Sequence, residues 1–341
     1  MISPWIFEFF PTYGMSEAEA FAWHMDLWPR TEAIGFEGIF FSEHHFGPGR
    51  MTPSPNLLIA AVAARTSTLR LGAMGMVLPL YEPWRVAEEI GMLDQISEGR
   101  LEMGFSSGAG PMEPLAVGIP QDEIKPRFQE GLEVVAKALT SPSFSHEGRY
   151  YAYSDLQIIP RPRQQPTPRG WMTCVSEGTA ALAGSYGYNA CTGFLPNADA
   201  KTLFDARAAA ADKAGKPSGP DQCALRRQIL VGETDAAAKA AGEEATEKLL
   251  AMFRGARPAG PDAAHTPSAA PDAPPRPRGL FFGPDETLTG SPASVAEQII
   301  EQCRATGAGH MLAYPFISAN PDDVGRSYEL WRQVNPILRK A

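Results

Sequence analysis

Three consecutive polar residues, Glu43, His44 and His45, are the strongest candidates for chemistry in this sequence. They follow the apolar run Gly38–Ser42, which has the character of a buried strand. Imidazole titrates near neutral pH, so a histidine at the end of a strand can exchange protons with a bound molecule. A structural histidine, hydrogen-bonded to a neighbouring strand, is the alternative interpretation.

A catalytic metal is a further hypothesis for the same residues. Adjacent residues on a strand point to opposite faces, so His44 and His45 cannot bind one ion unless the strand has ended. The His-x-His pattern that is typical of barrel metallohydrolases is absent from the sequence. The other histidines form no cluster in the sequence: His24, His146, His265 and His310. We therefore expect no metal site.

The turn from Val175 to Thr179 is the second candidate site. A predicted strand ends there and a helix begins, so the backbone N–H groups of Glu177, Gly178 and Thr179 would point outward at the positive end of the helix dipole. The hydroxyls of Ser176 and Thr179 can add further donors. This geometry suits a phosphate, and an ordinary helix N-cap without a ligand explains the same residues equally well.

A predicted strand–helix–strand unit, Leu69–Gly108, positions a third group of candidates. The apolar run Leu69–Leu78 precedes a helix that begins at Pro83, and a second apolar run follows at Leu101–Phe105. Such units build parallel sheets, and ligands bind at the carboxyl ends of their strands. The small residues Ser106, Ser107 and Gly108 lie at that end of the second strand.

Met74 and Gly75 lie within the first run of this unit. A glycine inside a strand can relieve crowding where the backbone bends. It can also let a flat ring lie against the backbone, because no side chain intervenes. Both interpretations of Gly75 remain open from the sequence.

Strand-like and helical segments alternate along nearly the whole chain of 341 residues. About eight strands are predicted, which fits a (β/α)8 TIM barrel in the α/β class. The alternative, a doubly wound open sheet, usually carries GxGxxG after its first strand, and no such motif follows there. The predicted strands are Trp5–Phe10, Gly38–Ser42, Leu69–Leu78, Leu101–Phe105, Gly170–Val175, Asn189–Leu195, Cys223–Val231 and His310–Phe316.

Two segments interrupt this alternation within a single predicted domain, residues 1–341. Gly148–Ile159 alternates like one arm of a β-hairpin, which predicts a small insertion over about residues 141–168. Gly255–Arg278 is dense in Pro, Ala, Gly and Asp, which predicts a long flexible lid loop over about residues 255–279. Ser16 followed by Glu19 predicts a capping box at the first helix.

Composition excludes several classes of function. The formal net charge of −9 leaves no electrostatic footprint for nucleic acid. The four cysteines never form CxxC, which argues against a zinc site and a disulfide scaffold. No apolar run reaches the roughly 18 residues that a membrane span needs, and the first residues lack the pattern of a signal peptide. We therefore expect a cytoplasmic protein without a membrane partner.

From Trp5 to Leu338, the sequence resembles the bacterial luciferase-like flavin-dependent monooxygenases. The resemblance rests on the triplet Glu43–His45, on SPNLLIAAVAART at Ser54–Thr66, on the Leu69–Gly108 block and on the Gln165–Thr179 passage with its SEGT turn. It implies a TIM barrel with an insertion, and a mobile lid in the region of Gly255–Arg278.

The resemblance also implies an activity. Reduced FMN, supplied by a separate flavin reductase, would react with O2 to give a C4a-(hydro)peroxide, which oxygenates a small, mostly apolar organic substrate. A homodimer is the implied assembly. Two alternatives remain: an F420-dependent oxidoreductase that transfers hydride, and a non-catalytic flavin-binding partner subunit.

Particular residues match the family's pattern. His44 matches its active-site histidine, and Met74-Gly75 matches a non-prolyl cis peptide under the flavin ring. Ser176 and Thr179 match phosphate-contacting positions, whereas Ser107 stands where the family often has an arginine. The residues expected to bind the cofactor are Met74, Gly75, Ser106, Ser107, Val175, Ser176, Glu177, Gly178 and Thr179. The residues expected to line the substrate pocket and keep it dry are Phe7, Phe9, Glu43, His45 and Phe194.

Overall fold

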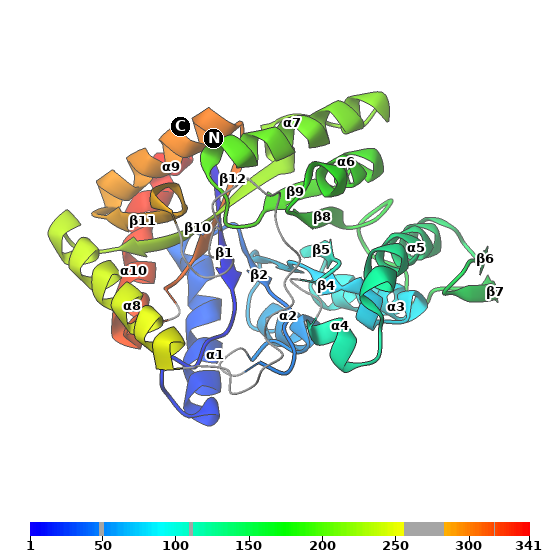
Figure 1. Ribbon diagram of the computed structural model, residues 1–341, viewed down its shortest axis with the longest axis horizontal. Helices are drawn as coiled ribbons and strands as arrows, with labels where there is room; N and C mark the ends of the chain where they lie inside the picture. Colours follow the sequence, from blue (N-terminus) through cyan, green and yellow to red (C-terminus); the bar gives the residue numbers. More distant parts are fainter. Residues whose placement is uncertain (48–50, 109–111, 256–282, 317) are drawn as a thin grey trace.

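The computed structural model describes residues 1–47, 51–108, 112–255, 283–316 and 318–341. Within these residues, eight parallel strands form a closed barrel, because the first strand pairs with the last and every strand pairs with two neighbours (Figure 1). In order around the ring they are β1 (Ser3–Glu8), β2 (Gly38–Phe41), β3 (Arg70–Ala73), β5 (Leu101–Ser106), β8 (Arg169–Cys174), β9 (Asn189–Thr192), β10 (Cys223–Val231) and β12 (His310–Tyr314). Closure confirms the predicted barrel and excludes the doubly wound sheet, which has two open edges.

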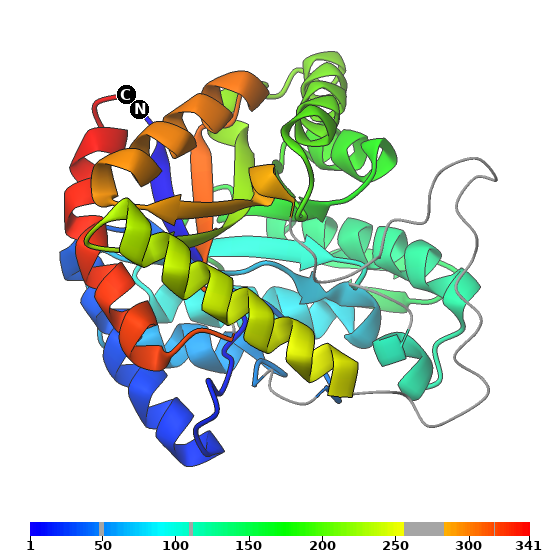
Figure 2. The ribbon, with the colours of Figure 1, turned by 60° about the vertical axis from the view of Figure 1, so that its left-hand side comes forward.

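Two further strands extend this sheet. β4 (Met76–Val77) pairs with the end of β5, and together with β3 it replaces the single long strand predicted at Leu69–Leu78. β11 (Thr287–Gly290) pairs with the second half of β10 outside the ring, where α8 runs alongside it (Figure 2). The sequence analysis did not predict β11, because its four residues include only one large apolar side chain.

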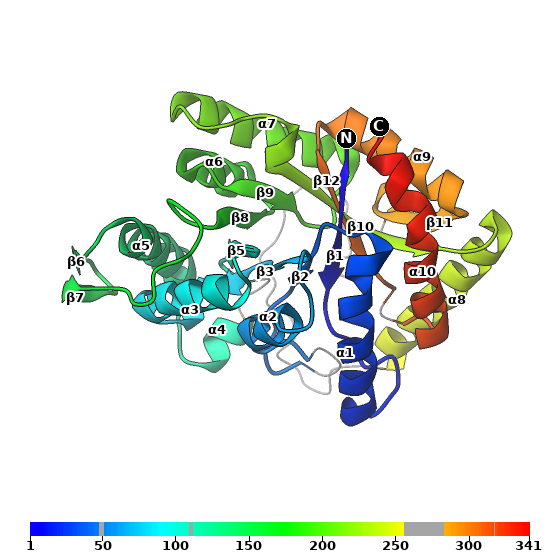
Figure 3. The same ribbon diagram turned by 180° about the vertical axis from the view of Figure 1, so that it is seen from behind.

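Helices surround the barrel on its outside (Figures 1 and 3). The described helices are α1 (Glu17–Ile34), α2 (Pro55–Ala63), α3 (Pro83–Ile96), α4 (Met112–Ala116), α5 (Gln121–Thr140), α6 (Glu177–Tyr186), α7 (Asn197–Lys213), α8 (Asp235–Gly255), α9 (Pro292–Thr306) and α10 (Pro321–Leu338). Short 3-10 turns occur at Leu78–Leu80, Pro220–Gln222 and Pro284–Glu286. In the described part of the chain, no helix is both long and apolar enough to cross a membrane.

The capping box predicted for α1 is confirmed. The Ser16 hydroxyl accepts a hydrogen bond from the Glu19 backbone N–H, and the Glu19 carboxylate accepts one from the Ser16 N–H. Gly35 ends the helix with φ of 94°, a left-handed conformation that glycine adopts without steric cost. These local signals fix both ends of α1, so that β2 begins three residues later.

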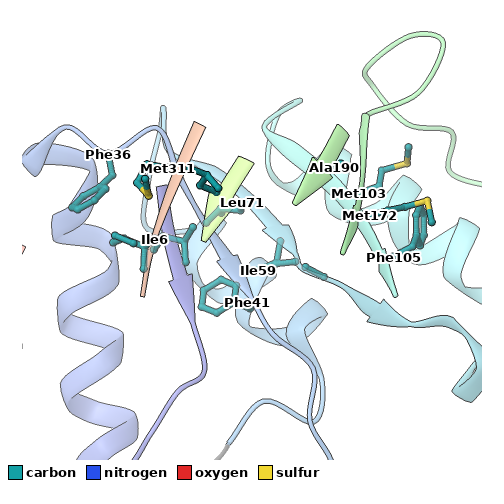
Figure 4. Packing of buried hydrophobic residues seen from close by; sticks show 14 of the residues in the cluster. Ile6, Phe36, Phe41, Ile59, Leu71, Met103, Phe105, Met172, Ala190 and Met311 are labelled. Atoms are coloured by element: carbon teal, nitrogen blue, oxygen red, sulfur yellow. The ribbon is translucent and has the colours of Figure 1, made fainter. Parts of the chain in front are cut away.

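Strand residues alternate between two apolar layers. Outward-facing side chains such as Ile6, Phe41 and Leu71 pack beneath the helices (Figure 4). Inward-facing side chains fill the barrel itself: Trp5, Phe7, Phe40, Met74, Trp171, Cys191, Ala224, Leu312 and Tyr314. Burying each large side chain stabilises the fold by about 1.5–3 kcal/mol, so the barrel interior is a solid core.

A polar network lies at the amino-terminal end of the barrel strands. The Glu102 carboxylate, which is 1% exposed, forms ion pairs with Arg70 and Arg169. It also accepts a hydrogen bond of 2.5 Å from Trp171 Nε1. On the opposite wall, Trp5 Nε1 donates to His310 Nδ1 at 3.1 Å. We call this end, defined by these six residues, the closed end of the barrel.

The predicted insertion contains an antiparallel hairpin of β6 (Phe144–Glu147) and β7 (Ala152–Leu156), which projects away from the barrel beside α5 (Figure 1). The strand predicted at Gly148–Ile159 is therefore shorter in the structure, and β6 was not predicted. The Glu130 carboxylate of α5 accepts backbone hydrogen bonds from the hairpin turn at Tyr150 and Tyr151. The lid predicted at about residues 255–279 lies outside the described residues, apart from Gly255 at the end of α8.

Candidate functional site at the mouth of the barrel

The barrel gathers the predicted site residues at its carboxyl-terminal end, which we call the mouth. All strands in the ring are parallel, so the segments that follow them emerge at the same end. Residues 43–45 follow β2, residues 74–75 follow β3, residues 106–108 end β5, residues 175–179 follow β8, and Phe194 follows β9. The structure thus brings the separate sequence motifs to one rim.

His44 lies among aromatic rings at the mouth. Its imidazole stacks on Phe9, with ring centres 5.2 Å apart and planes 11° apart. Phe9 in turn packs edge-on against Phe7 and Tyr314, at 5.0 Å and 4.8 Å. The His44 side chain is 10% exposed. A histidine in this position can exchange a proton with a bound molecule while bulk water is largely kept away.

Glu113 on α4 is the partner of His44, and the sequence analysis missed it. His44 Nδ1 lies 3.3 Å from Glu113 Oε1, and the same oxygen accepts a 2.9 Å hydrogen bond from the His45 backbone N–H. The other carboxylate oxygen, Oε2, is buried and has no hydrogen-bond partner within the described residues. Glu113 is 69 positions from His44 and stands on a five-residue helix, so no local pattern indicates the contact.

His45 and Glu43 form a separate pair. His45 Nε2 lies 2.9 Å from Glu43 Oε1, and Glu43 Oε2 accepts a 3.1 Å hydrogen bond from the Val77 backbone N–H. The hydrogen bond to Glu43 raises the pKa of His45. Glu43 therefore anchors the end of β2 to β4. The two imidazoles contact different carboxylates, and both histidines lie beyond the end of β2 at Phe41.

No group of three or more His, Cys, Asp or Glu side chains arranged to hold a metal ion is found within the residues that the structure describes. The four cysteines are all buried and free. Burial raises the pKa of each thiol, for example that of Cys191 to about 11. They pack as small apolar side chains, which is the role their apolar strand-like surroundings predict.

The peptide bond between Met74 and Gly75 is cis, as the resemblance implied. A Cβ on Gly75 would lie 2.6 Å from the backbone carbon of Phe105 and 2.7 Å from its nitrogen. The space that a side chain would need is therefore occupied by β5. This contact favours the crowding interpretation of the glycine. A flavin contact at Gly75 remains a prediction.

The turn after β8 has the predicted form of a helix N-terminus. The Ser176 hydroxyl accepts a hydrogen bond from the Thr179 N–H at 3.3 Å and lies 2.7 Å from Thr179 Oγ1. Val175 is 68% exposed, and a Cβ added to Gly178 would meet nothing within 4 Å. The turn is capped and open to solvent on its outer side. An anion can approach the N–H groups at the start of α6 there.

Ser106 is engaged in the neighbouring turn. Its hydroxyl donates to the Gly75 carbonyl oxygen at 3.3 Å and accepts from the Gly108 N–H at the same distance. β5 and β8 are adjacent in the barrel, so Ser106, Ser107 and the Ser176 turn occupy neighbouring positions on the rim. Near the end of β8, the Thr173 hydroxyl is buried and has no hydrogen-bond partner among the described residues.

Arg226 on β10 is a second residue that the sequence analysis missed. Its guanidinium lies over the rings of Phe7 and Phe194, 4.4 Å and 4.5 Å from their centres. Its Nε is buried and has no hydrogen-bond partner in the part of the chain that the structure describes, and burial lowers the pKa of the guanidinium. The period of two within β10 could have indicated that one of the adjacent arginines, Arg226 or Arg227, faces the barrel interior.

The fold and the mouth together define a parallel α/β barrel with a cluster of aromatic rings at the carboxyl ends of its strands. The family model described as "Luciferase-like monooxygenase" matches residues 4–310. The chain belongs to this family of flavin-dependent oxidoreductases, as the sequence resemblance predicted.

Two curated relatives illustrate the range of the family. The uncharacterized protein y4wF of Sinorhizobium fredii is 30% identical over 314 residues, which is 90% of this chain and 88% of that protein. The oxygenase component of the flavin-dependent trigonelline monooxygenase of Acinetobacter baylyi is 31% identical over 157 residues, or 46% of this chain and 43% of that protein.

Solved structures agree in fold. The monooxygenase RslO1 from Streptomyces bottropensis gives a TM-score of 0.81 at 22% identity, covering 97% of this chain and 98% of that chain. The oxygenating constituent of 3,6-diketocamphane monooxygenase from Pseudomonas putida, in complex with FMN, gives 0.80 at 24% identity, covering 98% of both chains. An F420-dependent secondary alcohol dehydrogenase gives 0.73 at 16% identity, covering 99% of both chains.

Proposed function

We propose that this protein is a monooxygenase that uses reduced FMN and O2 to oxygenate a small organic substrate at the mouth of its barrel. The observation that carries the proposal is the His44–Glu113 pair, held against Phe9 at the carboxyl ends of the strands in a chain of the luciferase-like family. A non-catalytic flavin-binding subunit would not need a buried histidine–carboxylate pair at this place.

The residues of the rim fit a phosphate-bearing flavin. The turn at Ser176 offers an open helix N-terminus, and Ser106 and Ser107 lie on the adjacent strand end. The buried Thr173 hydroxyl near the end of β8 needs a hydrogen-bond partner that a polar ring could supply. We expect the 106–107 and 175–179 segments to hold the phosphate, with the ring beside Met74 and Gly75.

When bound, reduced FMN would supply the activation of O2, which protein side chains cannot perform. The chain supplies the environment. The Glu113 carboxylate holds the Nδ1–H tautomer of His44, so that Nε2 is the nitrogen that accepts a proton from substrate or returns it. The rings of Phe7, Phe9, Phe194 and Tyr314 exclude water from the reacting atoms.

A separate flavin reductase is part of the proposal. The Acinetobacter baylyi relative is named an oxygenase component, which supports a reductase that supplies reduced FMN to this chain also.

A homodimer is the proposed assembly. α2 and α3 pack side by side, and a second copy could cover the large apolar side chains that they expose: Leu57 at 72% on α2, and Met92 and Ile96 at 51% and 45% on α3. The cytoplasmic location expected from the sequence remains a prediction.

Cofactor binding separates the main alternatives. F420 is the cofactor of the similar secondary alcohol dehydrogenase. The apoprotein is therefore titrated with FMN and, separately, with F420. Binding of each cofactor is measured from the quenching of its fluorescence. We expect clear preference for FMN. The FMN-loaded protein is then supplied with a flavin reductase, NADH and O2, and H2O2 release is measured. Tighter binding of F420, or no binding of either cofactor, would contradict the proposal.

A further inference from the structure

We infer that Arg226 binds a carboxylate of the substrate, and that the substrate is a small organic acid with an apolar body. The inference deepens the proposed function, because it assumes that the same mouth receives the substrate. It narrows the mostly apolar molecule expected from the sequence to an anion.

Arg226 differs from its neighbour Arg227, because no polar side chain in the described part of the chain forms a hydrogen bond or ion pair with it. Arg227 Nε donates to Gln302 Oε1 at 2.6 Å, and its Nη2 donates to Asn197 Oδ1 at 2.7 Å, outside the barrel. Arg226 faces the interior, where its guanidinium contacts two phenyl rings. No carboxylate among the described residues forms an ion pair with it, and its Nε is buried without a hydrogen bond.

An unpaired guanidinium in an apolar setting favours an anionic ligand. Removal of a charge from water is costly unless a counter-charge and hydrogen bonds replace the hydration. Arginine is suited to carboxylates because its planar fork can donate two parallel hydrogen bonds. Arg226 keeps part of its surface exposed at the mouth, so a bound molecule can reach it.

The order of strands around the barrel places this cation across the mouth from the position expected for the flavin ring. Arg226 is on β10, and Met74 and Gly75 follow β3. Three strands separate β10 from β3 in either direction around the barrel, so the two strands face each other across the mouth. A substrate whose carboxylate is bound at Arg226 would extend from there toward the flavin and His44.

The walls between these positions suit an apolar body. Phe7 and Phe194 flank the guanidinium, and Phe9 continues the aromatic surface from Phe7 to the His44 ring. Glu113 beside His44 would repel a carboxylate, so the anionic end of the substrate is directed to Arg226. The mouth therefore has one cationic side, one acidic side and an aromatic surface between them.

The test compares matched acids and amides. Benzoate and benzamide, and hexanoate and hexanamide, are titrated into the full-length protein by calorimetry at pH 7.5, with and without saturating FMN. The variants are Arg226→Met, which keeps a long apolar stem between the rings, and Arg226→Lys, which keeps the charge. Arg304→Met is the control, because it removes an exposed positive charge from α9.

We expect wild type and Arg304→Met to bind each acid about tenfold or more tightly than its amide. The preference should vanish in Arg226→Met and be kept in part in Arg226→Lys, with unchanged affinity for FMN in each variant. Equal binding of acid and amide by wild type, or no binding of any of the four compounds, would overturn the inference. A loss of FMN affinity in Arg226→Met, with the acid preference intact, would assign Arg226 to the flavin instead.

Failure of the proposed monooxygenase function and failure of the carboxylate site at Arg226 give different results in this experiment. Acid preference is measured without flavin, so a protein that binds acids through Arg226 but not FMN would refute the monooxygenase and keep the carboxylate site. A protein that binds FMN and shows no acid preference would refute the carboxylate site and leave the proposed monooxygenase function in place. Thermal unfolding of each variant, followed by circular dichroism, shows that the compared proteins are folded.

Discussion

The two ends of the barrel treat polar groups in opposite ways. At the closed end, the Glu102 carboxylate is saturated by Arg70, Arg169 and Trp171. At the mouth, Glu113 Oε2, Thr173 Oγ1 and Arg226 Nε are all buried and have no hydrogen-bond partner among the residues that the structure describes. Both ends are built from the same parallel strands, so the fold does not dictate the difference. These three groups of the mouth lie where a ligand can complete them.

The largest effect is expected from breaking the closed end. Glu102→Ala leaves two guanidinium groups facing each other without a counter-charge and should lower the free energy of unfolding by about 3–5 kcal/mol. Urea denaturation measures the change. Arg226→Met is the matched test at the mouth: it removes a cation that has no ion-pair partner among the described residues, so stability should change by about 1 kcal/mol or less.

Equal destabilisation by the two substitutions would contradict the comparison between the ends. Glu329→Ala serves as a surface control, because the pairs of Glu329 with Arg30 and Arg332 are exposed. The Glu329→Ala substitution should lower the free energy of unfolding by about 1 kcal/mol or less.

The next effect concerns chemistry at the mouth. His44→Ala removes the group proposed to exchange protons and should lower the rate of substrate oxygenation by about 10²–10⁴-fold, without loss of FMN affinity. The rate is followed as incorporation of 18O from 18O2 into a substrate found by screening organic acids. His45→Ala is the control, because His45 pairs with Glu43 instead. Full oxygenation by His44→Ala would remove the proposed role.

A smaller effect tests the rim. Replacing Ser176 and Thr179 together by Ala removes the hydroxyls beside the N-terminus of α6 and should weaken FMN binding by about tenfold. Riboflavin lacks the phosphate, so its affinity should hardly change. Fluorescence titration of both ligands measures the difference. Equal losses for FMN and riboflavin would mean that the turn does not hold a phosphate.

The smallest effect is a pH dependence of stability. The hydrogen bond to Glu43 raises the pKa of His45 above its ordinary value of 6.5, so the folded chain favours the protonated ring. The contribution of the His45–Glu43 pair to the free energy of unfolding is complete below pH 6.5. It is lost as the pH rises through the pKa of His45 in the folded protein. His45→Gln should therefore cost about 1 kcal/mol or less in urea denaturation at pH 5.5, and less at pH 9. A cost that grows with pH would contradict this assignment.

The sequence predicted what local patterns specify. The capping box of Ser16 and Glu19, and the strands that deliver His44 and Ser176, follow from short-range signals, and the barrel follows from their alternation. Glu113 and Arg226 could not be found in this way. Glu113 reaches His44 through a short helix after an irregular loop, and Arg226 differs from Arg227 only in which face of β10 it occupies.

The space beside Gly75 shows a second limit of sequence patterns. A glycine there is compatible with crowding by a strand or with an approaching ring, and only the position of the Phe105 backbone distinguishes the two. The split of the predicted Leu69–Leu78 strand into β3 and β4 has the same origin. Both depend on how β5 packs, which is a property of the closed barrel.

The central claim is that the mouth binds reduced FMN and controls its reaction with O2. The most direct measurement mixes the protein, loaded with reduced FMN under anaerobic conditions, with O2 in a stopped-flow spectrometer. We predict a transient absorbance distinct from that of reduced and oxidised FMN, with slower return to oxidised flavin than in free solution. Oxidation at the rate of free reduced FMN, without a transient, would contradict the account.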